Sequence, residues 1–587
     1  MFRIKRCGFF IIITLIFTQS CFSKEDDLQF PAIVVTQRRQ LTFATYASAG
    51  AQSKGINYQS ALENLNFLPV DLQSRSLRSG IQTDFSIRGS TAEQVSVLLN
   101  GQRVNDPQTA HYDCDLPFTK ADIRRLEVSG ASTQAINFVL DQPKQRKIIL
   151  ESGIGSFRDG YGLFSFSDKI KNFGFRYSVE DAQSKGFRYD TDYKKFTTSI
   201  NTSLELPNLT WETNFGYQDK DYGAYDFYTP GLGYPSQEAT RTYLINSGLS
   251  LDQAGLLIKP NFLWRRHFDK FTLDKTQLRS SSVNQHRTDM FTPGIFLQKE
   301  AGLLGKLGLG AQFNQQRITS TNLGKHQRDQ RSVFLEDSKD FGSRWKFDSV
   351  LRLDDFSDFG KVITGSANLK FQLSDEFGLN FGIGRNMRQP SFTELYYSDP
   401  YTIGSSDLSA EKSWNYQAGI DYTRQGFFCS FLIFMRRERE MIDWVKQSSG
   451  QLWQARNFTK DDVLGFQYYL RKKINHIFSL DANYTYTNKS IDNQGYLYKY
   501  GPNYARHLVN TVLNIQLPFG RQEIGLNFKK KAGRRGWLLA NAGLNYDLTK
   551  NYRIFLNCEN ILNVEYQDIE GIPQPGRYFE AGLKIEW

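Results

Sequence analysis

Residues 84–128 decide the fold of this chain. They contain three short runs rich in apolar and β-branched residues: Asp84-Phe85-Ser86-Ile87-Arg88-Gly89, Val95-Ser96-Val97-Leu98-Leu99-Asn100-Gly101-Gln102-Arg103-Val104 and Ile123-Arg124-Arg125-Leu126-Glu127-Val128. Gly, Asn and Asp separate these runs, which is typical of strands joined by tight turns. Asn100-Gly101 is the strongest turn signal, because both residues tolerate positive φ in a two-residue hairpin loop. The residues alone predict a small, mixed β domain.

The same stretch resembles the N-terminal plug of TonB-dependent outer-membrane receptors. In that family a strand ends in Arg-Gly, a hairpin follows with the pattern "v-l-l-n/d-G-v-r-v-n", and a later strand reads "i-e-R-i-E-V". The resemblance implies a plug domain over residues 41–145, in which residues 57–70 carry the apolar spacing of a helix. The residues that match, and to which it implies a structural role, are Arg88, Gly89, Asn100, Gly101 and Glu127.

The composition favours a transmembrane β-barrel over a soluble multidomain protein. Aromatic residues reach 14% although mean hydropathy is only −0.49, and the apolar residues are spread evenly along the 587 residues. A barrel has this profile because only every second residue of a strand faces lipid. The net charge of +11 comes from scattered Lys and Arg. This argues against nucleic-acid binding and favours a basic lumen or loops that meet anionic lipid or ligand.

Residues 146–587 carry the repeating pattern of barrel strands. Apolar and polar residues alternate between tight turns, as at Leu544 and Tyr546 before a turn and at Ile554 and Leu556 after it. A length of about 440 residues, at roughly 20 for each strand and its connection, gives about 22 strands. A tandem array of soluble β-sandwiches is the alternative, but no linkers are visible. The last strand ends on Trp587 and resembles the terminal strand that the barrel-assembly machinery reads in outer-membrane proteins.

The predicted fold class is therefore an all-β membrane protein. It consists of an antiparallel transmembrane β-barrel of about 22 strands, filled by an N-terminal α/β plug domain.

The N-terminus predicts export. Residues 1–23 have the basic start and short apolar stretch of a signal peptide, and the apolar stretch is too short to span a bilayer. An exported, β-patterned chain of this length indicates the outer membrane. Residues 24–40 predict a periplasmic segment in which Ile33, Val34, Val35 and Thr36 resemble a TonB box. In the family this box pairs with an edge strand of the inner-membrane energy-coupling protein; alternatively, these residues form the first plug strand.

Two polar segments are candidates for ligand binding. In cobalamin-type receptors the plug loop equivalent to residues 105–113 faces the ligand pocket. The resemblance therefore implies plug-apex contacts from Asn105, Asp106, Gln108, Thr109, His111 and Tyr112. Residues 218–242 predict a long external loop whose aromatic rings give contact area at low entropy cost. Its candidate residues are Tyr222, Tyr225, Asp226, Phe227 and Tyr228. An ordinary polar turn and a solvated loop are the respective alternatives.

Three further features bear on the site. After Val128 the plug sequence is shorter than the family pattern, which leaves a looser plug or altered gating open. Residues 388–396 resemble the receptors' "f-R-x-P-s-f-x-E-L-y" segment, for which we expect a structural role. Loop carboxylates that could hold calcium, as in cobalamin receptors, or could simply be solvated, are Asp113, Asp115, Asp219, Asp221 and Asp226.

The sequence contains no pattern that predicts an enzyme. There is no His-Glu-x-x-His pair, no Gly-x-Ser-x-Gly elbow and no phosphate-binding loop, so no site for hydrolysis or nucleotide use is expected. The resemblance implies active import of a scarce, large ligand, with energy from a TonB-type inner-membrane complex. The expected ligand is cobalamin-like, with ferric siderophores second. A passive outer-membrane porin or adhesin with a degenerate plug is the alternative.

Overall fold

The computed structural model describes residues 47–50, 58–78, 80–130, 133–277, 283–458, 460–491 and 495–587. The predicted signal peptide and the predicted TonB box at Ile33, Val34, Val35 and Thr36 lie outside the described residues.

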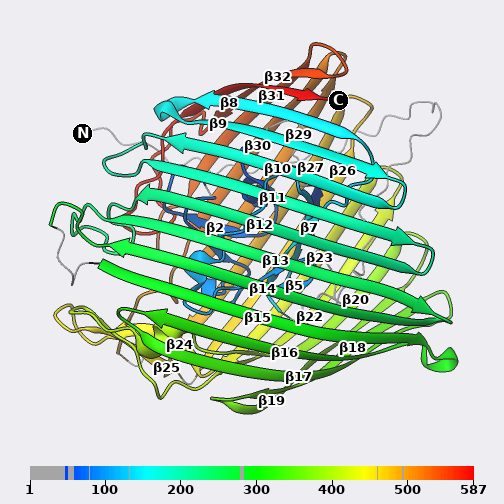
Figure 1. Cartoon of the computed structure of the whole chain (residues 1–587), viewed down its shortest axis with the longest axis horizontal. Coiled ribbons are helices and arrows are strands. Elements are labelled where there is room, and N and C mark those ends of the chain that lie inside the picture. The colour runs from blue at the N-terminus through cyan, green and yellow to red at the C-terminus, as the bar shows by residue number, and fades with distance from the viewer. Residues whose placement is uncertain are drawn as a thin grey trace, which may run out of the picture.

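A closed antiparallel barrel of 22 strands forms most of the molecule (Figure 1), which confirms the predicted strand number. The barrel closes where β33 pairs with β8, with Ala581 opposite Ile154. The first half consists of β8 (Lys147–Gly155), β9 (Gly160–Ile170), β10 (Phe173–Ser184), β11 (Tyr193–Leu206), β12 (Leu209–Gly223), β13 (Gln237–Gln253), β14 (Leu256–Thr272), β15 (Val283–Glu300), β16 (Lys306–Ser320), β17 (Gly324–Phe341) and β18 (Trp345–Phe356). The second half consists of β19 (Gly360–Gln372), β20 (Phe377–Arg388), β22 (Glu411–Arg424), β23 (Phe427–Arg439), β26 (Asp461–Lys473), β27 (Phe478–Ile491), β29 (Ala505–Leu517), β30 (Gly520–Lys531), β31 (Trp537–Asp547), β32 (Tyr552–Glu559) and β33 (Tyr578–Glu586).

Alternation along the strands sorts side chains between lipid and lumen. On β31 and β32, Tyr546 is 41% and Leu556 50% exposed, whereas their neighbours Asn545 and Asn557 are buried. Successive residues of a strand point to opposite faces, so the apolar set lies on the outer wall and the polar set lines the interior. No helix among the described residues is long and apolar enough to cross a membrane.

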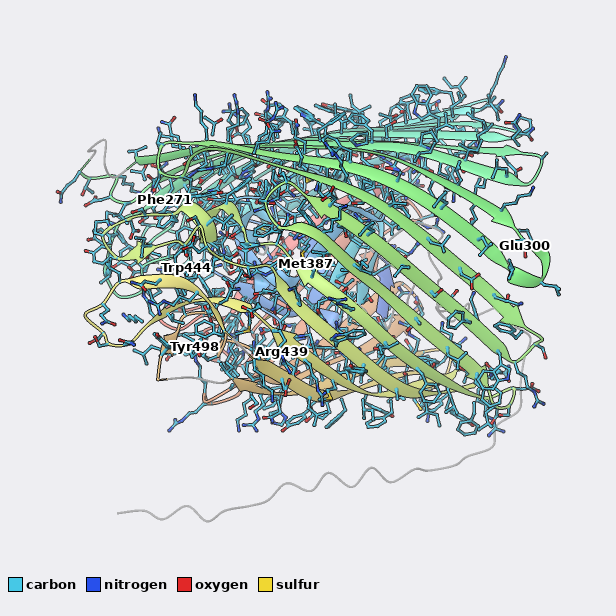
Figure 2. The ribbon with its side chains drawn as sticks, turned by 90° about the horizontal axis from the view of Figure 1, so that it is seen from below. Phe271, Glu300, Met387, Arg439, Trp444 and Tyr498 are labelled. Atoms are coloured by element: carbon cyan, nitrogen blue, oxygen red, sulfur yellow. The ribbon has the colours of Figure 1, made fainter. Side chains whose placement is uncertain are left out.

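The two ends of the barrel differ in loop length. The strands are joined by two-residue turns at 171–172, 207–208 and 254–255, all at the same end, and by long segments at 224–236, 389–410 and 440–460 at the other. In outer-membrane barrels the short turns face the periplasm and the long loops face outward. Phe271, Trp444 and Tyr498 lie toward the extracellular end, and Glu300 lies at the opposite end (Figure 2).

The extracellular loops have structure of their own. They form a four-stranded sheet in the order β21-β25-β24-β28, of which β24 and β25 are labelled at one end of the barrel in Figure 1. Its strands are β21 (Thr402–Ile403), β24 (Met441–Lys446), β25 (Trp453–Phe458) and β28 (Leu497–Tyr498), and the preceding loop contains helix α1 (Phe392–Tyr396). Two 3₁₀ turns lie in barrel connections, η4 (Ser156–Arg158) and η6 (Gly302–Leu304).

The plug is a small mixed sheet inside the barrel. Its five strands run in the order β1-β6-β7-β4-β5, beside the pair β2-β3. They are β1 (Ala47–Gly50), β2 (Asp71–Ser74), β3 (Thr83–Ser86), β4 (Ser96–Leu99), β5 (Gln102–Arg103), β6 (Ile123–Ser129) and β7 (Ala135–Leu140). The helix predicted within residues 57–70 is a 3₁₀ helix, η1 (Ala61–Phe67), and η2 (Ala92–Gln94) and η3 (Ala110–Tyr112) follow it. The shortened sequence after Val128 falls between the end of β6 and the start of β7, and its residues 131–132 lie outside the described residues.

The hairpin turn predicted at Asn100 and Gly101 joins β4 to β5. Both residues have positive φ, 49° and 80°, and Leu99 pairs with Gln102 across the turn. Asn100 also accepts a hydrogen bond from the Leu140 amide at 2.9 Å. The turn therefore fixes the short hairpin to the end of the neighbouring strand. Glu127 has a similar local role, because its carboxylate accepts hydrogen bonds from Arg125 and Asn137 at 2.7 Å each.

Arg88 and Gly89 join the plug to the barrel wall. The Arg88 guanidinium donates to Gln467 at 2.6 Å and to Gln417 at 3.2 Å, on β26 and β22. Gly89 has a φ of 72°, and a Cβ at this position would lie 2.9 Å from Cγ2 of Thr487 on β27. Only glycine meets both the backbone and the space requirements here.

Polar contacts dominate elsewhere along the plug surface. The buried Asp122 carboxylate accepts hydrogen bonds from Ser178, Ser199 and Asn201 of the wall, at 2.7 to 2.8 Å. On the opposite strands, amides of the wall donate to backbone carbonyls at the end of η1; the pairs are Asn483 with Phe67, Asn510 with Leu68 and Asn527 with Asn66. The polar faces of plug and lumen are thus hydrogen-bonded to each other.

Candidate functional site

The plug-apex loop, residues 105–113, is tied back onto the plug by its own side chains. Asn105 accepts from the Val97 amide at 2.9 Å and donates to the Val95 carbonyl at 2.8 Å. Asp113 accepts from Asn105 and from the Asp106 amide, the latter at 2.8 Å. Burial raises the pKa of the Asp113 carboxyl to about 7. Asn105 and Asp113 therefore shape the loop, and their polar atoms face the plug.

Asp106 joins this loop to the barrel by a buried ion pair. Its carboxylate pairs with Arg265 of β14, and the side chains are 0% and 2% exposed respectively. Thr288 of β15 donates to the same carboxylate at 3.0 Å, and the Gln108 amide donates at 2.8 Å. A buried charge is stable only when it is paired and hydrogen-bonded, so this contact fixes the position of the apex.

A second buried pair lies just after the loop. Asp115 pairs with Lys220 of β12 and accepts from Thr240 of β13 at 2.9 Å and from His267 of β14 at 3.1 Å. Burial opposes ionisation of this carboxyl, but Lys220 and His267 hold the pKa of Asp115 below its usual range. The apex is thus anchored to neighbouring strands on one side of the barrel.

Glu238 links the plug to an extracellular loop. This fully buried β13 carboxylate accepts three phenolic hydroxyls, from Tyr112 at 2.8 Å and from Tyr222 and Tyr228 at 2.7 Å each. Tyr112 belongs to the plug, Tyr222 to the end of β12 and Tyr228 to the loop that follows. These three hydrogen bonds tie the plug, the end of β12 and the following loop to one residue of β13.

The predicted boundaries of that loop are wrong. The sequence predicted it over residues 218–242, but β12 continues to Gly223 and β13 begins at Gln237, which leaves residues 224–236. Tyr222 is therefore a strand residue, buried in an aromatic cluster. Strands of this barrel extend beyond the apolar band, and outside that band polar strand residues and loop residues look alike in the sequence.

The loop folds inward onto the plug. Phe227 is 2% exposed, and its carbonyl accepts a hydrogen bond from Arg75 of the plug at 3.2 Å. Asp226, at a φ of 60°, accepts from the Gly233 amide at 2.8 Å and so closes the loop. Tyr225 points the other way and packs edge-on against Tyr189, with ring centroids 5.2 Å apart. Among the predicted loop residues, Tyr225 and Tyr228 are half-buried, whereas Tyr222, Asp226 and Phe227 are buried.

His111 is the least buried of the predicted apex residues. Its side chain is 18% exposed, and its Nδ1 lies 2.8 Å from Asp84. The ring centroid lies 5.5 Å from that of Tyr228 and 6.3 Å from that of Tyr500, which follows β28. Burial opposes ionisation of the Asp84 carboxyl, but the neighbouring Arg75 and His111 side chains hold the pKa of Asp84 below its usual range. His111, Tyr228 and Tyr500 form an aromatic, polar floor beneath the loops, which we call the apex floor.

Thr109 precedes His111 in the apex loop, next to Gln108, and its hydroxyl is held by the side chain of Glu93. Glu93 accepts from the Thr109 hydroxyl at 3.1 Å and from the Ala110 amide at 2.9 Å. Burial, with a further contribution from Glu394, raises the pKa of Glu93 to about 8. The Glu93 carboxyl therefore carries a proton at neutral pH while it accepts both hydrogen bonds.

Helix α1 covers the apex from the extracellular side. The amides of Phe392 and Thr393, in its first turn, donate to the carbonyls of Pro107 and Gln108 at 2.9 and 3.1 Å. Arg388 holds the helix by donating to both oxygens of Glu394, at 2.8 and 3.1 Å. The segment at residues 388–396, for which a structural role was predicted, thus joins the extracellular connection between β20 and β22 to the plug by hydrogen bonds.

A family model described as TonB dependent receptor-like, beta-barrel, matches residues 152–561. The chain belongs to the TonB-dependent receptors. The vitamin B12 transporter BtuB of Photobacterium profundum is 22% identical to this receptor over 449 residues, which are 70% of each chain. The ferrienterobactin receptor of Escherichia coli is 26% identical over 457 residues, 70% of this chain and 56% of that protein.

Solved structures agree on the fold of the receptor. The ferric enterobactin receptor of Pseudomonas aeruginosa, crystallised with enterobactin, superposes with a TM-score of 0.75 at 16% identity. The match covers 92% of this chain and 99% of that chain. Similarity therefore establishes the family, the fold and the outer-membrane location of the receptor, and the choice of ligand has to be argued from the site.

The carboxylates considered for calcium do not converge in the receptor. Asp113 and Asp115 are engaged inside the lumen, as described above. Asp219 pairs with Arg241 at 2.9 Å, and Asp221 accepts from a neighbouring glutamine at 2.7 Å. In the described part of the chain no group of three or more His, Cys, Asp or Glu side chains is arranged to hold a metal ion. These carboxylates therefore do not form the loop calcium site that the resemblance left open as one alternative.

Sequence reasoning missed Glu238, Tyr500 and the pairing of Asp84 with His111. Tyr112 and Tyr222 meet at Glu238, although 110 positions separate the two tyrosines. No local pattern marks such a meeting, because it depends on which barrel strand lies next to the plug apex. The polar and aromatic character of both segments was the available signal.

Proposed function

We propose that this receptor actively imports a scarce, large ligand, with energy from a TonB-type inner-membrane complex. The observation that supports this most strongly is the plug anchored by buried pairs such as Asp106 with Arg265 and Asp115 with Lys220. Passage of a large solute requires such contacts to break, and the sequence has no motif that would use a nucleotide to break them.

The apex favours a cobalamin-like ligand over a ferric siderophore. A ferric catecholate complex is an anion and is bound best by unpaired cations. Three cations near the apex floor already have carboxylate partners: Arg75 with Asp84 at 2.8 Å, Arg265 with Asp106 and Lys220 with Asp115. A fourth cation, Lys499, has its Nζ 5.3 Å from the centroid of the Tyr500 ring. The rings of the apex floor suit a large, neutral ligand with amide groups, which they can contact and hydrogen-bond. Ferric siderophores remain the second candidate class.

Uptake by cells tests both parts of the proposal. Cells without receptors of their own would express this chain, with and without the coupling protein, and receive radiolabelled cyanocobalamin or members of a ferric siderophore panel. We expect cyanocobalamin uptake that depends on the coupling protein. If only a ferric siderophore were taken up in a coupling-dependent way, active import would stand but the ligand would be the siderophore and not cobalamin. Uptake of many small solutes without the coupling protein would favour a passive porin, the function that the short β6–β7 connection could support.

The proposed TonB box can be tested separately. Proline at position 34 removes a backbone donor needed for pairing with an edge strand, so Val34→Pro should abolish coupled uptake while ligand binding persists. Val34→Ala keeps the donor and serves as the matched control. Normal uptake by the Val34→Pro variant would show that Ile33, Val34, Val35 and Thr36 are not the coupling segment. We further propose that the barrel-assembly machinery recognises β33, the strand that closes the barrel by pairing with β8.

A further inference from the structure

The first and last strands of the barrel meet at a seam, where β33 pairs with β8. In Figure 1, β8 lies beside the C-terminal strands β31 and β32 at the top of the view. The pairing at the seam covers only residues 149–155 of β8 and 580–586 of β33. By comparison, β14 pairs with β15 along its whole length, residues 256–272. The seam is therefore a short ladder between two strands that no loop connects.

Arg78 of the plug lies at the extracellular end of this seam. Its guanidinium donates to Asp159, in the connection between β8 and β9, at 2.9 Å. It also donates to Glu580 of β33 at 3.3 Å and to Glu559, at the end of β32, at 3.2 Å. One buried side chain of the plug, 4% exposed, thus contacts both the first hairpin and the last two strands of the barrel.

Tyr578 of β33 extends the same network across the seam. Its hydroxyl donates to the Asp159 carboxylate at 2.7 Å, and the Arg78 guanidinium lies over its ring, 4.4 Å from the centroid. Gly155 of β8 leaves the space for this crossing, because a Cβ there would lie 2.6 Å from the Tyr578 Cζ atom. The glycine therefore lets the tyrosine reach from the last strand to the first connection.

Beyond the end of the ladder, the seam depends on side chains. The Phe579 amide donates to the Ser156 hydroxyl at 3.0 Å, in a contact that is exposed to water. The Arg78 network lies next to it and is buried, so water competes less for its hydrogen bonds. The buried network is thus the stronger of the two contacts that hold this end of the seam.

A second plug cation contacts the seam nearer to the periplasm. Lys120 pairs with Glu151 of β8, and the two side chains are 5% and 1% exposed. Glu151 also accepts from the Tyr161 hydroxyl of β9 at 2.6 Å, and it lies opposite Lys584 of β33. The plug therefore supplies positive charge to the seam at two levels, and at the upper level Arg78 reaches both edges.

We infer that the plug has a second role besides filling the barrel, in which Arg78 fastens the extracellular end of the seam by joining the first hairpin to the last strand. Asp159 and Glu580 are buried, and a buried charge is stable only when it is paired and hydrogen-bonded. Arg78 serves both carboxylates with one planar group whose donors point in fixed directions. The seam is thus complete only with the plug in place, whichever ligand the receptor imports.

The test is amide hydrogen exchange of the purified full-length receptor in detergent, followed by mass spectrometry. Exchange of a strand amide reports how often its ladder opens. Arg78→Met leaves Asp159 and Glu580 without their shared cation, so residues 149–155 and 580–586 should exchange at least about tenfold faster than in the parent. The rise should be confined to the seam, and amides of β22 and β23 should exchange as in the parent.

Arg88→Met is the matched control. It also removes a buried plug guanidinium, but one that donates to Gln467 of β26 at 2.6 Å and to Gln417 of β22 at 3.2 Å, away from the seam. Because distant sites act nearly independently, seam exchange in this variant should stay within about twofold of the parent. Equal acceleration of the seam by both variants would indicate general loosening of the plug and would overturn the inference. An unchanged seam in Arg78→Met would overturn it as well.

A milder variant keeps the inference testable if Arg78→Met does not assemble, as judged by heat-modifiable gel migration. Arg78→Lys keeps the charge, but a compact ammonium cannot serve Asp159 and Glu580 at the same time as the guanidinium does. We expect seam exchange at least about threefold faster than in the parent, with β22 and β23 unchanged. Exchange at the parent rate in the seam of Arg78→Lys would then overturn the inference.

Discussion

Replacement of Asp106 by asparagine should loosen the plug. In the parent, the carboxylate neutralises the Arg265 guanidinium, whose side chain is 2% exposed, and accepts from Thr288 at 3.0 Å. Asp106→Asn leaves a buried cation without a counter-charge, a defect that costs about 3–5 kcal/mol. Arg265 keeps its hydrogen bond to the Tyr112 carbonyl at 3.1 Å, so the lower value is the better expectation.

A loss of about 3 kcal/mol corresponds to a shift on the order of 100-fold toward a displaced apex. The assay is entry of a large hydrophilic antibiotic, or swelling of proteoliposomes in a sugar, both without the coupling protein. Asp106→Asn should raise leakage clearly above the parent. The double replacement Asp106→Asn with Arg265→Met removes both charges and should restore closure, because no buried cation is left without a counter-charge.

Asp219→Asn is the matched control, since it breaks the exposed pair with Arg241, whose side chains are 39% and 53% exposed. Exposed pairs contribute little, so this variant should remain closed. The reasoning is refuted if Asp106→Asn is as tight as the parent, or if the double replacement leaks more than the single one.

Further predictions address pH, the loop, the plug turn and the ligand. Because the pKa of Glu93 is about 8 in the fold and 4.5 unfolded, the contribution of Glu93 to plug stability should be fully present below pH 4.5 and be lost as the pH rises from there through 8; Glu93→Gln should remove this part of the pH dependence in amide hydrogen exchange of the plug. Glu238→Gln gives three tyrosines a weaker acceptor and should expose residues 224–236 to proteolysis, with a loss of about 2 kcal/mol. Gly89→Ala should cost about 1–2 kcal/mol in chemical unfolding of the plug because its φ is 72°. His111→Ala should weaken cyanocobalamin binding about tenfold, as expected for loss of about 1.4 kcal/mol of contact, and should also lower the melting temperature because His111 pairs with the buried Asp84; unchanged binding would exclude the apex floor as the ligand site.

The architecture could be predicted because it depends on local patterns. Asn100 and Gly101 specify a turn by backbone conformation alone, and alternation around Tyr546 and Leu556 specifies which face of a strand meets lipid. The strand number followed from chain length, since each membrane crossing needs a similar number of residues. These signals are contained within a few consecutive residues, so tertiary context does not change them.

For the site, the sequence could predict which segments contribute to it but not the role of each residue. Asn105 and Asp106 belong to the apex loop, as expected, but their polar atoms are used to hold that loop, and His111 is left as the accessible group. The roles of Glu238 and Tyr500 depend on which strand and which loop meet the plug, and neither is encoded locally. The start of the loop was predicted at residue 218, before Tyr222, for the same reason. Contacts with neighbouring strands and the plug extend β12 beyond the membrane, and no local pattern encodes them.

The hydrogen-bonded surface between plug and barrel has a consequence for movement. The groups that hold the plug in place, such as Asp122 with Ser178 or Asn510 with the Leu68 carbonyl, are groups that water solvates equally well. When a pulling force opens a gap, entering water can take over each lost partner in turn. The hydrogen-bonded parts of the plug surface and of the lumen surface can both stay wetted as the gap opens, whereas Leu244, Leu263 and Met290 of the wall, which cluster with the plug core, would lose apolar contacts. The resistance of the polar contacts to displacement is therefore divided into many small steps.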